Sequence, residues 1–538
     1  MGRIKIMRKS FLFSIAIILA SITPAFAETR LVPSEYVTIQ YAINLANNGD
    51  TIIVDPGVYL ENLNFLGKSI TVTSTDPENP DIVAATIIDG YRAGSVVIFK
   101  SGEGPEAVLS GFTITGGVGT YDVTFGEGNN ILWGPGIYCT NSSPTIKNNL
   151  IKGNTGLQMV DPQNPDTWRL GYGGGIGCFN SNAVIYRNVI KNNEAFAGAG
   201  VMTYLGNPII NSNLIYNNSA YIGGGLVLLA SGNVINNTIV GNDANLEIEG
   251  GTGIAGNIYA LSDPDFGGGQ YLIANNIICD AKTGYGVLMS GSGGGLIISN
   301  NVWNNSPSNY VEEDSQTGNI GQGRGTDKTG RNGNISQNPL FVDPNNNDYH
   351  LQFDSPCIGA GNSSYVPEPN ATMDIDNEPR IYAGSVDIGA DEYVGYIKPI
   401  AYAGPNQYIS TSELVTLDGS GSYFYDPNGI MIFRWIQVDG PAVTLSDPNS
   451  AQPTFMPEQE GEYRFELIVN DGIYDSEPDD VSIFVQNLEP VVDAGQDLLM
   501  ASPSSIVTFD SRDFCVHHQG LLTYYRDHLI DLVDSHNL

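Results

Sequence analysis

A repeat of about 25 residues constrains the fold of this chain more than any other feature of its sequence. Glycine-rich turns begin at Gly173, Gly198 and Gly223, each 25 positions after the one before. Between the turns, short runs of β-branched residues are separated by Asn or Gly, and each run is too short to form paired helices. One such unit cannot bury its own apolar side chains, whereas a stack of units can. The repeat therefore predicts a solenoid of parallel strands, with three strands in each unit.

Equivalent positions of successive units should form ladders along the solenoid axis. We expect an inward aliphatic stack at Ile146, Ile185, Ile210, Ile235, Ile273 and Ile298. We expect an amide ladder, interrupted at Thr238, at Asn149, Asn188, Asn213, Asn276 and Asn301. A second amide ladder is expected at Asn154, Asn193 and Asn218. In such ladders each side-chain carbonyl accepts a hydrogen bond from the amide of the next unit, although isolated Asn residues also serve as simple turn formers.

The N-terminus has the features of an export signal. A basic head that contains Arg3 and Arg8 precedes an apolar run over 11–22, which is too short to span a bilayer. Small residues then predict cleavage after Ala27 and a secreted or cell-surface protein without a transmembrane segment. The formal net charge of −35 would repel phosphate backbones, so nucleic acid is excluded as a partner, and it would attract divalent cations.

Two regions of the chain resemble known families. Tyr36–Gln40 and Pro56–Glu61, with Asn300–Trp303 and Asp387–Tyr393 near the other end, resemble secreted pectate-lyase-like right-handed parallel β-helix proteins. Thr38 is then expected to be the N-cap of a short helix, extending through Ala46, that covers the end of the core. That superfamily includes lyases, hydrolases, esterases and binding proteins, so the resemblance implies a fold rather than one reaction.

The tail is a separate module. Residues 399–487 alternate apolar and polar side chains with turns between them, which is typical of a small antiparallel sandwich. Asp418–Ser422, Trp435 and Asn470–Gly472 resemble a polycystic-kidney-disease-type (PKD) domain. The predicted fold is all-β, a right-handed parallel β-helix solenoid followed by an Ig-like/PKD β-sandwich. The predicted segments are a signal peptide at 1–27, the β-helix at 28–396, the sandwich at 397–488 and an incomplete or disordered second PKD-like segment at 489–538.

Insertions between the Asn corner and the glycine turn are the first place to look for a site, because solenoids place such insertions on one face. The insertions cover 118–133, 156–172 and 244–250. Aromatic rings beside carboxylates and an arginine suit a polysaccharide, since rings stack on the apolar faces of sugars. The predicted catalytic residues are Arg169 as the base, with Asp161 and Asp166. The predicted substrate-binding residues are Trp133, Trp168, Lys152 and Lys191.

The residues leave the reaction open. Lysis of a uronate would use Ca²⁺ and a basic residue, whereas glycoside hydrolysis would need two carboxylates flanking the bond. The signature motifs of known pectate lyases and pectin methylesterases are absent, and His350 is the sole His of the expected β-helix, which argues against His triads and zinc sites there. The chain should therefore act on or bind an extracellular polysaccharide, and the alternative to an enzyme is a non-catalytic adhesion protein.

Two further groups of residues suggest chemistry. A Ca²⁺ shell is predicted from Asp374, Asp376, Glu378, Asp387, Asp391 and Glu392. The alternative is that these residues form a solvated acidic cap in which Arg380 pairs with one of the carboxylates. Cys139 and Cys178 share a position in the repeat, so they should lie on adjacent rungs, either as a disulfide or as two stacked thiols.

Overall fold

The computed structural model divides the chain between residues 395 and 396 into two compact units, which are described separately. The described residues are 27–121, 131–161, 164–229, 231–245, 253–262, 270–291, 294–313, 327–366, 372–382, 384–395, 398–410, 413–423, 431–472 and 474–486, and for 158–169 only the backbone is described. The predicted signal peptide up to Phe26 and the predicted incomplete segment after Gln486 lie outside these residues. No helix in the described part is long and apolar enough to cross a membrane.

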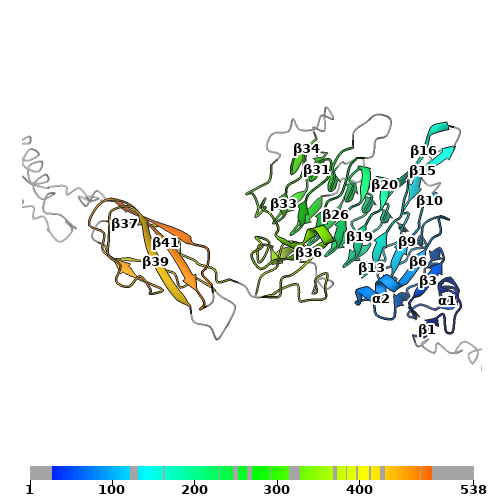
Figure 1. Ribbon diagram of the computed structural model, residues 1–538, viewed down its shortest axis with the longest axis horizontal. Coiled ribbons are helices and arrows are strands. Elements are labelled where there is room, and N and C mark those ends of the chain that lie inside the picture. The colour runs from blue at the N-terminus through cyan, green and yellow to red at the C-terminus, as the bar shows by residue number, and fades with distance from the viewer. Residues whose placement is uncertain are drawn as a thin grey trace, which may run out of the picture. The chain divides into compact units, whose positions relative to one another are not determined.

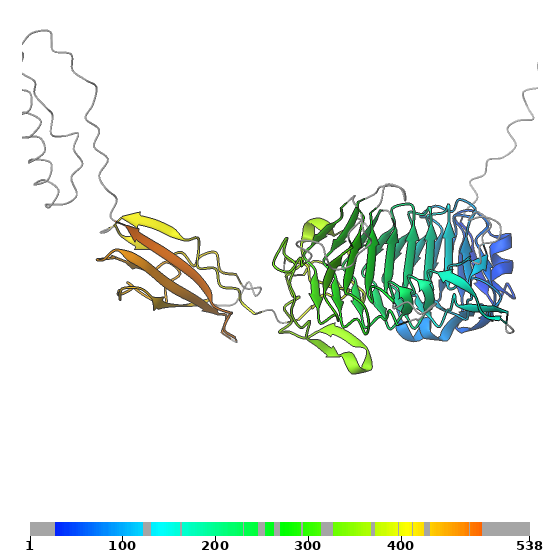
Figure 2. The same cartoon turned by 90° about the horizontal axis from the view of Figure 1, so that it is seen from above.

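The first unit is a parallel β-helix with three long sheets (Figures 1 and 2). Sheet A contains, in order, β1 (Thr29–Val32), β2 (Thr51–Val54), β5 (Thr71–Ser74), β8 (Val108–Ser110), β13 (Thr145–Lys147), β18 (Val184–Tyr186), β22 (Ile209–Asn211), β26 (Gly232–Ile235), β29 (Tyr271–Ala274) and β32 (Leu296–Ile298). Sheet B contains β3 (Gly57–Leu60), β6 (Thr86–Asp89), β9 (Thr113–Thr115), β14 (Leu150–Lys152), β19 (Val189–Lys191), β23 (Leu214–Tyr216), β27 (Thr238–Val240), β30 (Ile277–Cys279) and β33 (Asn301–Trp303). Sheet C contains β4 (Leu63–Asn64), β7 (Val97–Phe99), β12 (Ile137–Thr140), β17 (Ile176–Phe179), β21 (Val201–Tyr204), β25 (Leu226–Leu229), β28 (Ile258–Leu261), β31 (Val287–Ser290) and β34 (Tyr310–Glu312).

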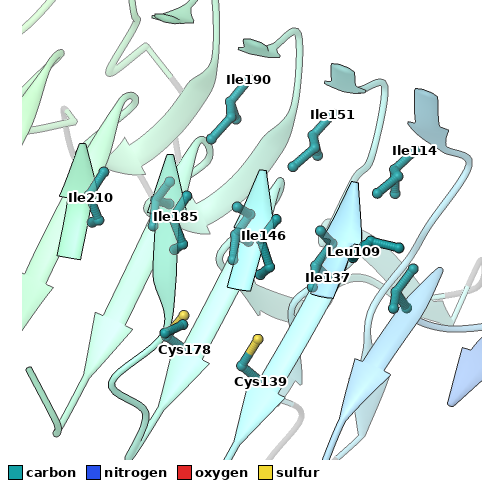
Figure 3. Close-up of a cluster of buried hydrophobic side chains, with 14 of the residues drawn as sticks. Leu109, Ile114, Ile137, Cys139, Ile146, Ile151, Cys178, Ile185, Ile190 and Ile210 are labelled. Carbon is teal, nitrogen blue, oxygen red and sulfur yellow. The ribbon is translucent and has the colours of Figure 1, made fainter. Parts of the chain in front are cut away.

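The inward aliphatic stack is confirmed for four of the six predicted isoleucines and shifted by one residue for the other two. In sheet A the stack is Leu109, Ile146, Ile185, Ile210, Val234, Ile273 and Ile297. Figure 3 shows its first four members, Leu109, Ile146, Ile185 and Ile210. Ile235 and Ile298 are the next residues along their strands and point to the opposite face. The steps from Ile210 to Val234 and from Ile273 to Ile297 are 24 residues, one fewer than the repeat. Because side chains alternate along a strand, a slip of one residue exchanges the two faces.

The same slip corrects the first amide ladder. Its members are Asn149, Asn188, Asn213, Asn237, Asn276, Asn300 and Asn334. Asn237 fills the step that Thr238 was expected to interrupt, and Asn300 takes the place expected for Asn301. The Oδ1 of Asn213 accepts from the backbone N–H of Asn188 and from its side-chain amide, both at 3.0 Å. The second ladder is confirmed at its three predicted positions and continues through Asn242.

A fourth sheet corrects the expectation of three strands in each unit. Sheet D lies between sheets B and C in the chain, and its strands are β10 (Thr120–Tyr121), β11 (Ile131–Trp133), β15 (Gln158–Asp161), β16 (Asn164–Tyr172), β20 (Glu194–Ala197) and β24 (Ser219–Ile222). The glycine turns connect sheet D to sheet C. Gly173 has a φ of +73°, and a Cβ there would lie 2.4 Å from the Cα of Gly177. Only glycine fits so tight a reversal, which explains the turns that mark the repeat.

Other elements pack against the β-helix at its N-terminal end and along sheet B. Helix α1 (Ile39–Leu45) begins at the predicted N-cap, where the Thr38 side chain accepts from the Tyr41 N–H, and it buries Ile39 and Ile43. Helix α2 (Pro80–Ala85) follows β5 in the chain. After the last rung, the described residues of 338–395 are here called the strap, and Phe341, Leu351, Cys357 and Ile388 of the strap pack against the outside of sheet B, near β36 in Figure 1. The strap contains β35 (Phe341–Asp343), η3 (Pro344–Asn346), β36 (Asp348–Leu351) and η4 (Ser363–Tyr365).

The second unit is a small sandwich. One sheet has the order β37 (Gln407–Ser410), β42 (Asp479–Gln486), β41 (Gly461–Asn470) and β39 (Ile432–Asp439), and the other pairs β38 (Val415–Thr416) with β40 (Thr454–Phe455). Trp435 is 3% exposed in the core between them, together with Tyr463 and Phe465. The alternating pattern predicted an antiparallel sandwich, and the strand pairs are antiparallel except for β37 with β42, which is parallel.

We expect Asn213→Ala to lower the stability of the β-helix strongly. The substitution leaves the N–H of Asn188 and the carbonyls of Ile185 and Asn211 without their partner in a fully buried corner. Each buried group left without a partner costs about 1–3 kcal/mol. Thermal unfolding followed by circular dichroism measures the effect, and Asn207→Ala, at an exposed position just before β22, is the matched control. Equal melting temperatures for the two variants would contradict the ladder.

We expect the thiols of Cys139 and Cys178 to react with alkylating reagents only after unfolding. The two residues are paired on adjacent rungs, both are fully buried, and both are free thiols. Burial raises the pKa of the Cys139 thiol well above its usual value, which lowers its reactivity further. Mass spectrometry of the alkylated protein, with and without denaturant, checks this expectation. Labelling of either residue in the folded protein would disprove it.

Candidate functional site

The outer surface of sheet C, together with the strand ends of sheet D, carries an aromatic cluster that we call the aromatic face. Its rings are those of Trp133, Tyr138, Tyr172, Phe179, Phe196 and Tyr204. The ring centroids of Trp133 and Tyr172 are 5.3 Å apart, with the planes inclined by 23°. Those of Phe179 and Tyr204 are 5.5 Å apart and inclined by 14°. The other contacts among these rings are stacked, tilted or edge-to-face, so the rings form one connected aromatic cluster.

The repeat itself builds this face. Side chains alternate along each strand of sheet C, so Ile176 and Cys178 point into the core while Phe179 points outward. Phe179 and Tyr204 are register partners on neighbouring strands, and adjacent strands lie about 4.8 Å apart. The tight reversal at Gly173 brings the end of β16, with Tyr172, back against the same surface. Tyr172, Phe179 and Tyr204 are partly exposed and are thus available to a ligand.

Trp133, one of the predicted substrate-binding residues, is part of this face. It is only 3% exposed, and its ring lies near those of Tyr138 and Tyr172, with centroid distances of 6.3 Å and 5.3 Å. Trp133 therefore packs among the neighbouring rings and does not present its own ring to solvent. Sequence analysis missed Phe179 and Tyr204, although the alternation after the glycine turns places them outward at equivalent positions of two repeats.

The predicted catalytic residues lie on the hairpin of β15 and β16, the longest excursion from sheet D (Figure 1). In the backbone pairing Arg169 lies opposite Gln158, Trp168 opposite Met159 and Asp161 opposite Asn164. The hairpin leads directly into Tyr172 of the aromatic face. The side chains of Asp161, Asp166, Trp168 and Arg169 lie outside the described residues, so their roles remain predictions.

Lys152 and Lys191 are on a different sheet from the aromatic face. They are register partners on the outside of sheet B. The Nζ of Lys191 donates to the Tyr216 hydroxyl at 2.8 Å and lies 5.2 Å from the centroid of that ring. The Tyr216 ring in turn packs against Tyr349 of the strap. The structure therefore does not bring these lysines together with the aromatic rings, and their predicted role stays untested.

All six residues of the predicted calcium shell lie in the strap, but they do not form one shell, and Glu378 donates its backbone N–H to Asp374. Asp374 accepts from the backbone N–H groups of Asp376, Glu378 and Glu392 at 2.7–3.0 Å. The two carboxylate oxygens of Asp387 accept from the N–H groups of Gly359 and Tyr393, at 2.6 Å and 2.8 Å. These contacts hold the loops of the strap in place.

Glu392 belongs to the same hydrogen-bonded core of the strap. Its Oε2 accepts from the Asp387 N–H at 3.0 Å and lies 3.6 Å from the guanidinium of Arg380. The Arg380 side chain is 1% exposed and donates to the carbonyls of Gly389 and Ala390 and to the hydroxyl of Ser212, which follows β22. Burial raises the pKa of Glu392 to about 9, and it raises that of Asp387 to about 6. The strap thus holds a buried ionisable pair beside one arginine.

The remaining two predicted metal ligands, Asp376 and Asp391, lie together with a histidine. One ligand atom each from His350, Asp376 and Asp391 lies within 4.8 Å of the others, and among the described residues this is the one such group. The Nε2 of His350 is 3.0 Å from the Oδ2 of Asp376, and its Nδ1 contacts the carboxylate of Asp348. Because His350 is the sole histidine of the expected β-helix, sequence analysis argued against both His triads and zinc sites in that domain. It did not consider a mixed site with two carboxylates, for which the Asp348-x-His350 spacing on one face of a strand was a signal.

Comparison with known proteins identifies the folds of both units. Residues 79–259 match the family model for the right handed beta helix region, and residues 403–485 match a family model for a PKD domain. The chain therefore contains a right-handed parallel β-helix followed by a PKD domain, as predicted. Neither match reports a lyase.

The relatives and solved structures described below each match a quarter of this chain or less. The Dyslexia-associated protein KIAA0319 homolog of Mus musculus is 30% identical over 138 residues, which are 24% of this chain and 12% of that protein. The solution structure of the PKD domain from KIAA 1837 protein is 27% identical, with a TM-score of 0.15, and the match covers 18% of this chain and 91% of that one. The PKD domain of human KIAA0319 is 15% identical, with a TM-score of 0.16, over 20% of this chain and 100% of that one.

We expect the first unit to lose stability as the pH rises from about 5 to 8. Burial raises the pKa values of Asp387 and Glu392, so the folded protein holds protons that the unfolded chain has already released above about pH 4.5. That stabilisation is lost as the pH rises through about 6 for Asp387 and about 9 for Glu392. Melting temperatures measured with chelator present should fall across this interval, and Glu392→Gln should flatten the fall. Glu106→Gln, at an exposed position, should leave it unchanged.

Proposed function

We propose that this protein is an extracellular glycan-binding protein and that its ligand lies on the aromatic face. The observation that carries the proposal is the stacked, partly exposed pair of Phe179 and Tyr204 on the outside of sheet C, with the partly exposed Tyr172 of sheet D in the same cluster. Aromatic rings of this kind bind the apolar faces of sugar rings, while their phenol groups supply hydrogen bonds at the rim. Because the rings repeat from rung to rung, they suit an extended chain of similar units better than a compact small molecule.

Binding without cleavage is the form of this proposal that the described side chains support best. From β7 to β31, the outward positions of sheet C carry apolar, aromatic, hydroxyl-bearing or glycine residues and no carboxylate. Glycoside hydrolysis needs two carboxylates about 5–9.5 Å apart, and calcium-assisted lysis needs an oxygen shell beside the sugar. An adhesion protein needs neither, and a PKD domain behind the β-helix suits a spacer or contact module.

A catalytic alternative rests on the hairpin of β15 and β16. Its backbone places Arg169, Asp161 and Asp166 on a projection that leads into the aromatic face. A polysaccharide lyase would use Arg169 to remove the proton next to a uronate carboxyl group. Export by the N-terminal segment is part of both versions, because polysaccharides of either kind are met outside the cell.

We expect Phe179→Ala and Tyr204→Ala each to weaken glycan binding by about tenfold or more, which corresponds to about 1.4 kcal/mol for one lost ring contact. A glycan array identifies the ligand, and affinity electrophoresis in gels containing it measures the loss. Tyr186→Ala is the matched control, because Tyr186 is likewise a partly exposed aromatic residue, but on the outside of sheet A. Equal retention of all three variants would disprove binding at the aromatic face.

Cleavage is tested separately by the ultraviolet absorbance of unsaturated uronates released from several polyuronates. We expect no product from the wild-type protein, with or without Ca²⁺. Product that forms with the wild-type protein and is lost in Arg169→Ala would establish the lyase alternative instead.

A further inference from the structure

The strap brings three separate chain segments to one point. His350 is on β36, Asp376 lies in the turn that follows Asp374, and Asp391 lies in the stretch that packs on sheet B near Thr238. One nitrogen and two carboxylate oxygens from these residues lie within 4.8 Å of one another. Side-chain exposure is 53% for His350 and 42% for Asp376, so an ion can reach the group from solvent.

We propose that His350, Asp376 and Asp391 bind a divalent transition-metal ion of the Zn²⁺ type, which fastens the β35–β36 hairpin to the rest of the strap. This site is independent of the aromatic face and of the proposed glycan ligand. It differs from the all-oxygen calcium shell expected from the sequence, because Asp376 and Asp391 of that shell meet a histidine.

The histidine is oriented for metal binding by a residue outside the ligand group. Asp348 contacts Nδ1 of His350, which fixes the ring and directs Nε2 toward Asp376 and Asp391. Asp348 and His350 are two positions apart on β36, so both side chains project from the same face of the strand. A carboxylate on the far nitrogen of a histidine is the usual outer-shell arrangement of metal-binding imidazoles, since it sets the tautomer and raises the basicity of the ligand nitrogen.

Asp391 is fixed before any ion arrives. It is 8% exposed, and its Oδ2 accepts from the Leu351 N–H at 2.7 Å. The nearby Arg380 guanidinium is directed instead to Gly389, Ala390, Ser212 and Glu392. Two carboxylates therefore face each other across a histidine, and a positive charge between them relieves their repulsion. Either a proton on His350 or a metal ion supplies that charge.

The donor set decides the class of metal. Ca²⁺ takes six to eight oxygen ligands, whereas one imidazole and two carboxylates suit Zn²⁺ and its first-row neighbours. The ion would bind neutral His350 through Nε2, and the proton that Nε2 carries would pass to solvent. Water would complete the coordination, because this trio supplies three ligand atoms.

The test uses the full chain, stripped with chelator and titrated with ZnCl₂ by calorimetry and thermal unfolding. We expect one equivalent of Zn²⁺ to bind at this site and to raise the melting temperature of the first unit. His350→Gln should weaken this binding at least tenfold and remove the rise, while Asp348→Asn, outside the ligand trio, should cause a smaller loss. Circular dichroism confirms that both variants fold.

The C-terminal histidines are the control for Zn²⁺ bound elsewhere. The double variant His517→Gln/His518→Gln should still bind one equivalent of Zn²⁺ tightly and should still show the rise in melting temperature. Three outcomes would overturn the proposal: no binding by the wild-type protein, binding unaffected by His350→Gln, or a rise produced equally by Ca²⁺. A rise produced equally by Ca²⁺ would indicate an oxygen site. No binding by the wild-type protein would show that a protonated His350 supplies the charge between the two carboxylates.

Discussion

Stacking of one coil on the next is the constraint on which the rest of this protein depends. A single coil of 24 or 25 residues has too little interior to fold alone, and it becomes stable only when its strands hydrogen-bond to matching strands above and below. Matching residues are then forced into columns. The aliphatic column that begins at Leu109 forms the core, and the Asn columns satisfy the corners, where backbone groups would otherwise be buried without partners.

The same constraint restricts the residue types at inward positions of the coils more than those at outward positions. Inward positions are restricted to residues that fill the core, such as Ile185 and Cys178, whereas outward positions are free to carry chemistry. On sheet C the outward positions include the rings of Phe179 and Tyr204, and on sheet B outward residues such as Tyr216 and Cys279 pack against the strap. The proposed glycan ligand and the proposed metal ion therefore belong to different faces, and each follows from what covers its sheet.

The strap illustrates how acidic residues take on different tasks within a few positions. Asp374 and Asp387 accept hydrogen bonds from backbone N–H groups and so hold the loops of the strap in place. Asp376 and Asp391, close to them in sequence, keep oxygens that face His350. The difference arises from backbone conformation, because a carboxylate enclosed by its own loop accepts amide hydrogens, whereas one at the edge of the loop faces a neighbouring segment.

The sequence by itself determined the solenoid, most of the first amide ladder, the predicted part of the second ladder and the sandwich, because each follows a short period that local spacing reveals. It misplaced Ile235 and Ile298 because two coils are one residue short, which no single-unit comparison detects. Sheet D, the convergence of Tyr172 with Tyr204 and the meeting of His350 with Asp391 were decided by the tertiary structure. Those contacts join residues whose separation in the chain follows no period, so only the path of the folded backbone brings them together.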